Sequence, residues 1–419
     1  ASRCRFPEDR ILRGRTGGFC GLVQARSGRQ DDSEFMRILT VNMSLDPVTG
    51  GGTAERTFQL SRHLAALGHS CTVLTAETGM TTARRANLKG CRVVTLPVLS
   101  ERFHILKAGQ KEIAALVEDE DIVHLMNHWT LLNALVYRAA RCLKKPYVVC
   151  PAGALPIFGR SRLLKKGYNA LVGRDLIREA SALIAISDNE MSHFADYGVS
   201  PDRITTIPNG IDPLDYQIYD VAKFRDQAGL GDAPYILFVG RLNPIKGPDL
   251  LLQAFGRIAH LHGNYHLVFA GPDGGMLASL RSAAQKLELD NKVHFTGYIG
   301  GADKAAAYHG ASFVVIPSRQ EAMSIVVLEA GICGKPVLMT DQCGFPAVSQ
   351  VNGGRIKAAA EGAIAEGLQS MIRDGGRSGK MGENLKRHVE QHYLWDIIAQ
   401  SYLAIFQKVL SLSVSEHVS

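Results

Sequence analysis

Two glutamates, Glu321 and Glu329, lie eight positions apart in the segment SRQEAMSIVVLEAGICG at residues 318–334. The apolar run before it, Ala311–Pro317, is short, β-branched and stopped by proline, which is typical of a buried strand. Glu321 would therefore stand in the loop that leaves the carboxyl end of a strand. In open α/β sheets that edge binds ligands, and a carboxylate there can accept hydrogen bonds from sugar or ribose hydroxyls.

The next residues predict a helix over Ile325–Cys333, with Ser324 as its N-cap. Gly334, followed by Pro336, marks the end of this helix, and Glu329 would lie on it. Amides at a helix start lack intrahelical acceptors and suit a phosphate. The whole segment therefore offers groups for both halves of a sugar nucleotide.

A second segment, YILFVGRLNPIKG, places Arg241 and Lys246 after the predicted strand Tyr235–Val239 and before a helix that starts near Pro248. An arginine fork and a lysine charge at a carboxyl edge can stabilise the charge that grows on a diphosphate leaving group, without a metal. Taken alone, the pair could equally be two solvated bases in a loop. The two glutamates downstream favour the diphosphate site.

A glycine-rich turn, DPVTGGGT at residues 46–53, separates the predicted first strand from a helix over Ala54–Leu67. Gly51 and Gly52 would let backbone amides approach an anion closely at a helix start. The turn is neither the GxGxxG fingerprint of dinucleotide-binding proteins nor a phosphate-binding loop ending in GKS or GKT. A plain tight connection between strand and helix is the alternative.

Two further loops would lie at the same edge of the second sheet. Gly271 belongs to AGPDGG after the strand His266–Ala270, and Tyr298 follows the strand Lys292–Phe295. Both loops could frame a nucleobase, and either could be an ordinary turn.

Histidines and acids near the strand Ile122–Leu125 have competing interpretations. His128 lies at or past the carboxyl edge, so it could reach a cleft or be a packed histidine, whereas His124 inside the strand favours the core. The acid pair Asp119 and Asp121 has the spacing that some sugar transferases use for a divalent metal. It precedes the strand, so a solvated helix end is the better interpretation, and we expect no metal site.

Short apolar runs alternate with helical periods along the chain, which predicts βαβ units and parallel sheets. The fold class is therefore α/β, with two Rossmann-like domains at residues 36–212 and 213–392 facing a central cleft, and a terminal helix near 393–412. The linker PNGIDPLDY at 208–216 contains two prolines and a glycine. The predicted strands lie near residues 37–41, 71–75, 92–95, 122–125, 147–150, 182–186, 204–207, 235–239, 266–270, 292–295, 312–316 and 337–339.

The 419 residues are 46% hydrophobic and 21% charged, and no run approaches the ~18 apolar residues that a membrane span needs. Eight scattered cysteines without a CxxC pair argue for reduced thiols and a cytoplasmic location rather than disulfides or zinc. Residues 1–35 contain 7 arginines and 5 acids without a hydrophobic period, so we interpret them as a disordered extension or an upstream translation artefact. The fold would start at Met36.

A basic stretch, residues 159–180, combines six bases with leucines at helical spacing. Such a segment could lie peripherally on the inner face of an anionic membrane that holds an acceptor. A core-packed helix with a solvated face is the commoner explanation. We expect no nucleic-acid partner.

Taken together, five motifs resemble the retaining glycosyltransferases of family 4, which have the GT-B fold. The resemblance runs from Met36 to the terminal helix, which in that family crosses back to the first domain. The motifs are the turn TGGG at 49–52, ISDNE at 186–190, PNGID at 208–212, GRLNPIKG at 240–247 and EAMSIVVLE at 321–329.

The resemblance implies roles for individual residues. Arg241 and Lys246 would bind the donor diphosphate, Glu329 the ribose hydroxyls, and Glu321 the transferred sugar. His128 would assist at the reacting centre. The remaining donor-site residues would be Gly51, Gly52, Asn209, Gly271, Tyr298 and the amides of Ser324 and Ile325.

Two departures from the family pattern affect these roles. Many members have a second histidine where this chain has Met126, and His128 two positions later would have to replace it. Ala322 and Ser324 stand where the family has glycines, so bulkier side chains would lie beside the donor sugar.

The resulting hypothesis is a retaining, metal-independent transferase of hexoses in cell-envelope polysaccharide or glycolipid synthesis. It would use no cofactor besides a nucleotide-diphosphate sugar, UDP-linked first and GDP-linked second, and a glycan or lipid-linked acceptor. The alternatives are a non-catalytic GT-B protein that binds sugar nucleotides and a GT-B sugar-nucleotide epimerase.

Overall fold

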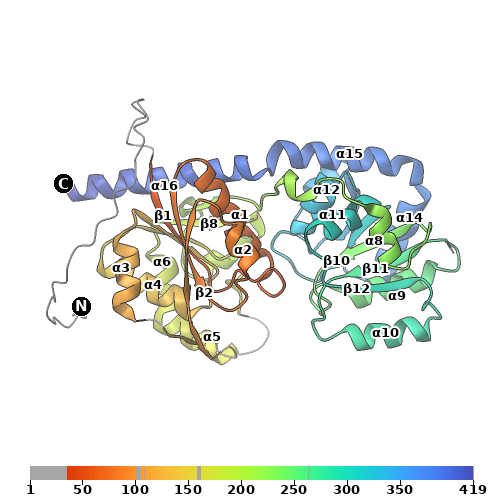
Figure 1. Ribbon diagram of the computed structural model, residues 1–419, viewed down its shortest axis with the longest axis horizontal. Helices are drawn as coiled ribbons and strands as arrows, with labels where there is room; N and C mark the ends of the chain where they lie inside the picture. The colour runs from red at the N-terminus through yellow and green to blue at the C-terminus, as the bar shows by residue number, and fades with distance from the viewer. Residues whose placement is uncertain (1–34, 101–104, 108, 158–161, 263, 419) are drawn as a thin grey trace.

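The computed structural model describes residues 35–100, 105–107, 109–157, 162–262 and 264–418. Residues 1–34, which make up nearly all of the expected extension, lie outside the described residues. The described chain forms two α/β domains side by side (Figure 1). The predicted fold class of two parallel-sheet, Rossmann-like domains is confirmed.

The first domain is built on a seven-stranded sheet in the order β3-β2-β1-β6-β7-β8-β9, with every neighbouring pair parallel. Its inner strands are almost wholly buried, as expected for a parallel sheet covered by helices on both faces, whereas the two edge strands are partly exposed. The strands are β1 (Arg37–Val41), β2 (Ser70–Ala76), β3 (Cys91–Leu96), β6 (Ile122–Met126), β7 (Tyr147–Cys150), β8 (Ala182–Ala185) and β9 (Ile204–Thr206). The helices are α1 (Gly51–Ala66), α2 (Thr82–Ala86), α3 (Gln110–Glu118), α4 (Leu131–Cys142), α5 (Arg162–Tyr168), α6 (Arg174–Arg178) and α7 (Met191–Ala195), with short turns η1 (Asn169–Gly173), η2 (Asp188–Glu190) and η3 (Pro201–Arg203).

The second domain has a six-stranded parallel sheet in the order β12-β11-β10-β13-β14-β15. Its strands are β10 (Tyr235–Val239), β11 (His266–Ala270), β12 (Val293–Gly297), β13 (Phe313–Ile316), β14 (Val337–Thr340) and β15 (Gly354–Lys357). The helices are α8 (Val221–Gln227), α9 (Pro248–Ile258), α10 (Leu277–Lys286), α11 (Gly301–Gly310), α12 (Ile325–Ile332), α13 (Ala347–Gln350), α14 (Glu361–Arg373) and α15 (Gly375–His392), and the linker contains η4 (Pro213–Tyr216).

Each sheet reverses its strand order once, and the reversal fixes where a ligand can bind. The first sheet reverses between β1 and β6, and the second between β10 and β13. Ligands of doubly wound sheets bind beyond the carboxyl ends of the strands at such a switch point. The loops that carry Gly51, Lys246 and Glu321 follow β1, β10 and β13, so the fold delivers them to the two switch points.

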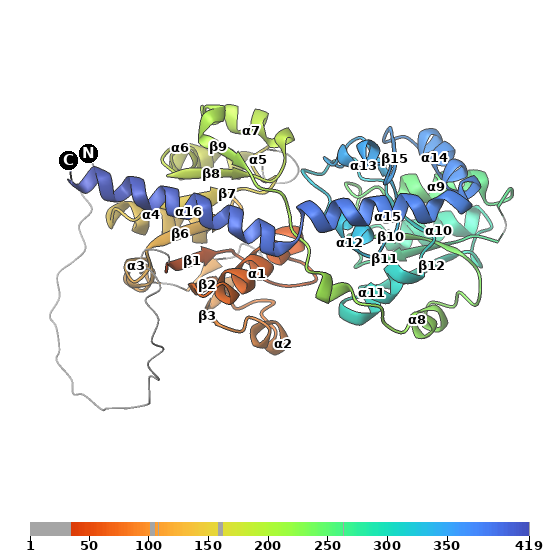
Figure 2. The ribbon, with the colours of Figure 1, turned by 90° about the horizontal axis from the view of Figure 1, so that it is seen from above.

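Two crossings connect the domains, and they touch each other. The linker forms an isolated parallel bridge between Ile211 and Leu394, where the chain returns from α15. The amide of Ile211 donates to Tyr393 O at 2.8 Å and Trp395 N donates to Ile211 O at 3.1 Å. The last helix, α16 (Trp395–Val418), then runs end to end with α15 across both domains (Figure 2).

Arg56 ties α1, the linker and α16 together from a fully buried position. Its guanidinium donates to Tyr402 Oη at 2.8 and 3.0 Å, to Ile207 O at 2.8 Å, and to Pro208 O and Asn209 Oδ1 at 2.8 Å each. Tyr402 and Phe406 both pack against His124 of β6 in the first domain. One buried cation therefore holds three elements that come from distant parts of the chain.

Three strands escaped sequence analysis. The antiparallel strands β4 (Val98–Ser100) and β5 (Ile105–Leu106) are very short, and β15 is a half-exposed edge strand of sequence GRIK. None has the run of β-branched apolar residues that marks a central strand. Helix α1 begins at Gly51, three residues before the predicted start. Among the described residues, no helix combines the length and apolarity needed to cross a membrane.

Candidate active site

Lys246 and Glu321 form an ion pair at the switch point of the second sheet. The Lys246 Nζ to Glu321 Oε1 distance is 3.0 Å, and the hydroxyl of Ser318 also donates to this carboxylate. The Glu321 side chain is 9% exposed and that of Lys246 32%, so the lysine is the member that solvent or a ligand meets first. The sequence alone predicted that both residues lie at this edge, and the structure brings them into direct contact.

Gly247 explains how closely the two loops approach. Its backbone has φ 67°, and a Cβ at this position would stand 2.1 Å from Pro317 O. Any side chain would therefore drive apart the loop that holds Lys246 and the loop that leads to Glu321. The glycine that ends GRLNPIKG is needed for this contact rather than for flexibility.

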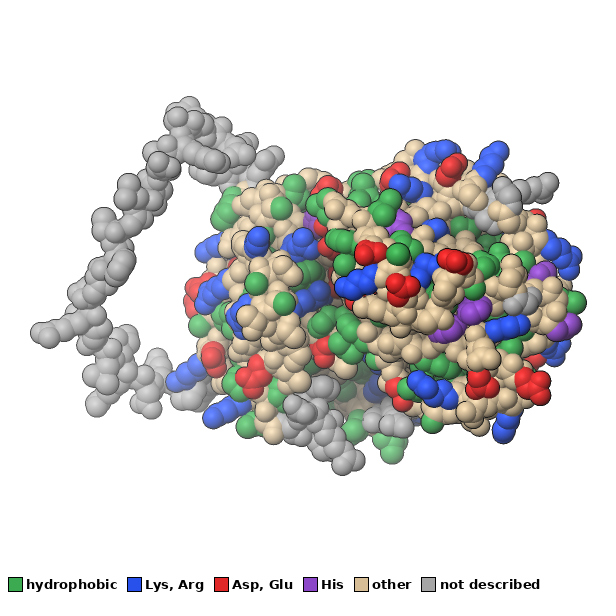
Figure 3. All heavy atoms as spheres, turned by 45° about the vertical axis from the view of Figure 1, so that its right-hand side comes forward, with side chains coloured by type: hydrophobic (Ala, Val, Ile, Leu, Met, Phe, Trp, Pro, Cys, Tyr) green, Lys and Arg blue, Asp and Glu red, His purple; other side chains and the backbone are tan. Residues whose placement is uncertain are grey.

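Arg241 reaches across to the other domain. Its guanidinium donates to Thr49 O at 2.8 Å, in the glycine-rich turn after β1. Among the described residues, it has no carboxylate within ion-pair distance, so its charge is available to an anion. The segment GRLNPIKG and the glycine-rich turn thus meet across the domain boundary. The space-filling view shows a recess between the two lobes of the molecule (Figure 3).

The glycine-rich turn also meets the start of α12. A Cβ on Gly52 would lie 3.2 Å from Ile325 Cδ1, and Gly51 has φ 63°. From the linker, Asn209 donates its side-chain amide to Met323 O at 3.4 Å. The helix start that follows Glu321 is therefore contacted by two segments, the glycine-rich turn of the first domain and the linker.

The start of α12 differs in detail from the expectation. The Ser324 amide is not free, because it donates to Cys343 O at 3.2 Å. Ser324 occupies the N-cap position, but its hydroxyl makes no capping hydrogen bond and is a buried atom without a partner among the described residues. Ile325 is at the first helical position, whose amide has no intrahelical acceptor. One expected amide of the pair is therefore engaged in the fold and one can serve an anion.

Glu329 is the centre of a buried hydrogen-bonded cluster. Its Oε1 accepts from Tyr216 Oη at 2.7 Å and from Lys304 Nζ at 2.9 Å, and its Oε2 accepts from Tyr308 Oη. Burial raises the pKa of Glu329, but Lys304 and the tyrosine hydroxyls outweigh burial and hold that pKa below its ordinary value. The carboxylate is ionised at neutral pH, with lone pairs left for further donors.

Lys304, Tyr216 and Tyr308 were not among the predicted site residues. They come from α11 and from the linker, and no local pattern connects them with a glutamate on α12. The one sequence signal for these residues was Lys304, which lies on the buried side of an alanine-rich helix. A buried lysine needs a carboxylate partner. Glu329, expected at a ribose, thus also connects the linker to helices α11 and α12 of the second domain.

Gly271 and Tyr298 lie at the carboxyl edge as expected, and the loop that carries Gly271 packs against Arg241, since a Cβ on Gly274 would lie 2.9 Å from Arg241 Cγ. A Cβ on Gly271 would stand 2.0 Å from Gly240 O, so this glycine lets β10 and β11 end side by side. Tyr298 is 46% exposed beyond β12. Their expected roles at a nucleobase stay predictions.

His128 is buried rather than exposed in a cleft. Its Nε2 lies 3.0 Å from Asn169 Oδ1 and 3.4 Å from Tyr197 Oη, while Trp129 and Tyr168 pack against the ring. The backbone explains the inward turn, because β6 extends to Met126 and the next residue takes φ 71°. Direct contact with a substrate would require a movement that uncovers this ring. His124 is buried in the core against Tyr402 and Phe406, as expected.

Acid should destabilise the folded protein through His128. Burial lowers the pKa of this histidine to about 4, against 6.5 in an unfolded chain. Between pH 6.5 and 4, His128 is therefore protonated in the unfolded chain and neutral in the folded protein. The free energy of unfolding falls over this range by up to ~3 kcal/mol. Urea unfolding at a series of pH values should show a shallower decline for His128→Gln.

The exposed His260 gives the matched control, because His260→Gln should leave the decline unchanged. His124 adds to the decline in wild type and in His128→Gln alike, since burial lowers the pKa of His124 to about 3. Equal slopes for wild type and His128→Gln would mean that His128 is charged in the folded protein.

A loop of the first domain that sequence analysis missed also contacts the site. A Cβ on Gly153, after β7, would lie 3.0 Å from Ala322 Cβ, next to Glu321. The buried carboxylate of Glu190 holds this loop by accepting from Gly153 N and, at 2.6 Å, from Ile186 N. Glu190 ends the motif ISDNE, so the motif acts through a neighbouring loop.

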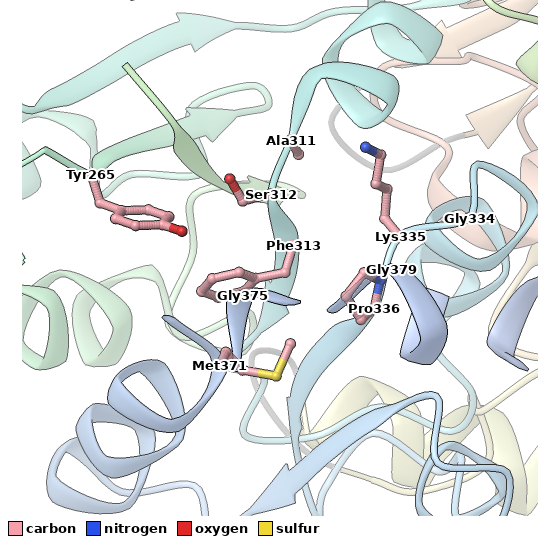
Figure 4. A pocket seen from close by; sticks show the side chains of 10 residues that line it. All are labelled: Tyr265, Ala311, Ser312, Phe313, Gly334, Lys335, Pro336, Met371, Gly375 and Gly379. Carbon is pink, nitrogen blue, oxygen red and sulfur yellow. The ribbon is translucent and has the colours of Figure 1, made fainter. Parts of the chain in front are cut away.

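Other candidate features lie away from these loops. A cavity of about 270 Å³ opens at the amino edge of the second sheet (Figure 4), lined among others by Tyr265, Ser312 and Lys335. No predicted site residue lines it. Asp121, at the amino edge of the first sheet, pairs with Arg37 at 2.6 Å. In the part of the chain that the structure describes, no group of three or more histidines, cysteines and acids could hold a metal ion.

Comparisons with known proteins assign each domain to a family model. The model "Glycosyltransferase Family 4" matches residues 50–213, and "Glycosyl transferases group 1" matches residues 220–388. An uncharacterized glycosyltransferase of Methanocaldococcus jannaschii is 27% identical over 397 residues, which cover 90% of this chain and 99% of that protein. A D-inositol 3-phosphate glycosyltransferase of Catenulispora acidiphila is 30% identical over 251 residues, 57% of this chain and 58% of that protein.

A solved structure has the same architecture. The Anabaena protein HepE, crystallised with UDP and glucose, superimposes with a TM-score of 0.74 at 19% identity, over 89% of this chain and 100% of HepE. At this identity the likeness shows a shared GT-B fold.

Proposed function

Because the chain belongs to the GT-B glycosyltransferases of the family 4 type, with one family model on each domain, we propose that it transfers a sugar from a nucleotide-diphosphate sugar with retention of anomeric configuration. The proposed donor is a UDP-sugar first and a GDP-sugar second, and the acceptor is a glycan or lipid-linked sugar of an envelope polysaccharide or glycolipid. The observation that carries this proposal is the Lys246–Glu321 pair, with Arg241 opposite.

The donor would bridge the two domains. Its diphosphate would lie between Arg241, Lys246 and the amide at the start of α12, where two cations and a backbone donor meet a dianion. Its ribose would extend towards Glu329. Glu321 would accept hydrogen bonds from the hydroxyls of the transferred sugar.

Transfer would then break the bond between the anomeric carbon and the β-phosphate oxygen. The acceptor hydroxyl would attack the same face and pass its proton to the departing oxygen, so that configuration is retained. Lys246 and Arg241 would stabilise the negative charge that builds on the diphosphate. We propose that no metal or cofactor takes part.

Calorimetric titration with UDP, GDP and ADP in the presence of EDTA tests the donor site. We expect one diphosphate to bind tightly without metal, and Arg241→Ala to weaken it about tenfold or more. The exposed Arg138 on α4 gives the control, because Arg138→Ala should bind as wild type does. Failure of all three diphosphates to bind would contradict the proposal, and binding that requires a divalent metal would contradict its metal independence.

A further inference from the structure

Three leucines of the first domain have largely exposed side chains. Leu163 and Leu164 on α5 are 84% and 69% exposed, and Leu171 on η1 is 81% exposed. The same apolar stripe continues into the core, because Leu176 and Ile177 on α6 are buried. The segment is therefore buried at one end and exposed at the other. Its exposed leucines can be removed from water only by contact with another molecule.

Positive charge surrounds these leucines. Residues 162–174 contain four bases and no acid. Lys165 stands over the Trp129 ring at 5.3 Å and Arg174 over the Tyr197 ring at 6.0 Å. Arg162, Lys166 and Arg174 are exposed. We use the name α5 patch for the exposed residues Leu163, Leu164, Leu171, Arg162, Lys166 and Arg174.

The patch lies on the side of the first domain that faces away from α16 (Figure 1). It is anchored to the carboxyl edge of the sheet, since Tyr168 Oη donates to Thr130 O at 3.1 Å. Trp129 in turn donates from its indole nitrogen to Ala154 O, in the loop that contacts Ala322. Contacts therefore run without a break from the patch to the loop that holds Glu321.

We propose that the α5 patch docks the protein on an anionic lipid bilayer. The three leucines enter the boundary between headgroups and acyl chains, and Arg162, Lys166 and Arg174 meet lipid phosphates. Exposed leucines flanked by bases are the combination that such a surface selects, because each apolar group and each positive charge adds to the attraction. A soluble acidic partner would not need the leucines, and a second copy of this chain would bring the same positive charge against itself.

Docking would also indicate which acceptor the enzyme uses. This one step rests on the proposed function, whereas the docking itself does not. A bilayer held at α5 places lipid headgroups next to the Ala154 loop, on the acceptor side of the first domain. The acceptor would then be a sugar carried by a lipid in that bilayer. Residues 159–161 of the expected membrane segment lie outside the described residues, so the described part of the segment carries the inference.

Flotation of the full-length protein with lipid vesicles tests the docking. We expect binding to vesicles of phosphatidylcholine with 30% phosphatidylglycerol, and little to pure phosphatidylcholine. The double change Leu163→Ser and Leu171→Ser should weaken partitioning at least tenfold, and Arg162→Gln with Lys166→Gln about fivefold per charge. The control changes Leu261→Ser and Leu412→Ser, at leucines 59% and 56% exposed elsewhere, should have no effect.

Three flotation results would overturn the proposal. They are no binding to anionic vesicles, equal binding to neutral ones, and unchanged binding of the leucine variant. Sedimentation that shows a dimer in wild type and a monomer in the leucine variant would assign the patch to a second copy instead. Flotation needs no donor, so failure to bind UDP would remove the proposed function without affecting this result.

Discussion

Replacing Lys246 with alanine should lower kcat by about 10²–10³ and leave the fold intact. The lysine is 32% exposed, pairs with Glu321 at 3.0 Å and lies beside a helix start, so its removal deletes charge where a leaving diphosphate would form. Loss of one preorganised group that stabilises developing charge costs roughly 3–4 kcal/mol in the transition state. Initial rates with saturating donor and acceptor measure the effect.

The control for this change is Lys223→Ala, at an exposed lysine of α8 in the same domain. It should leave kcat unchanged. Thermal unfolding of both variants should stay within a few degrees of wild type, because neither lysine belongs to the core. A Lys246→Ala enzyme with wild-type turnover would exclude a leaving-group role for this residue, whatever its effect on donor affinity.

Replacing Arg56 with alanine should lower the free energy of unfolding by about 4 kcal/mol, the largest stability effect we expect from one substitution. The change strips donors from Tyr402, from Asn209 and from two buried carbonyls at once. Each buried polar group left without a partner costs about 1–3 kcal/mol, and water entering the space recovers part of this. The midpoint of urea unfolding is the measurement.

Arg138→Ala on the exposed face of α4 is the matched control and should change stability by less than ~0.5 kcal/mol. Arg56→Lys should fall between wild type and Arg56→Ala, since an ammonium group keeps the charge but not the planar fork. A loss below ~1 kcal/mol for Arg56→Ala would mean that α16 and the linker are held by apolar packing alone.

The sequence contained most of the information on the sheets. Central strands such as Tyr235–Val239 and Tyr147–Cys150 were predicted to the residue, because buried parallel strands are short apolar runs with clear punctuation. Edge strands such as β15 lack that signal. Lys246 and Glu321 could be placed because each lies in the loop that follows such a strand, and the carboxyl ends of neighbouring parallel strands share one edge.

What the sequence could not supply was which way side chains turn and which distant groups meet. The sequence left open whether His128 reaches a cleft or packs inside, and the structure shows it buried just after Asn127, whose φ is positive. The partners of Glu329 come from α11 and the linker, which no local spacing connects. For the apolar stripe of residues 159–180, a core-packed helix is the commoner explanation from sequence. Only the three-dimensional structure shows which of its leucines are buried and which are exposed.

The return of α16 to the first domain has a consequence for the order of events during synthesis. A ribosome delivers β1 to β9 first, yet the face of that sheet covered by Tyr402 and Phe406 waits until the whole second domain has been made. At about 5–20 residues per second this interval lasts on the order of ten seconds or more. During that time the first domain must persist with an exposed apolar face, to which a chaperone could bind. His124 and Arg56 become buried only when the final helix packs against the first domain.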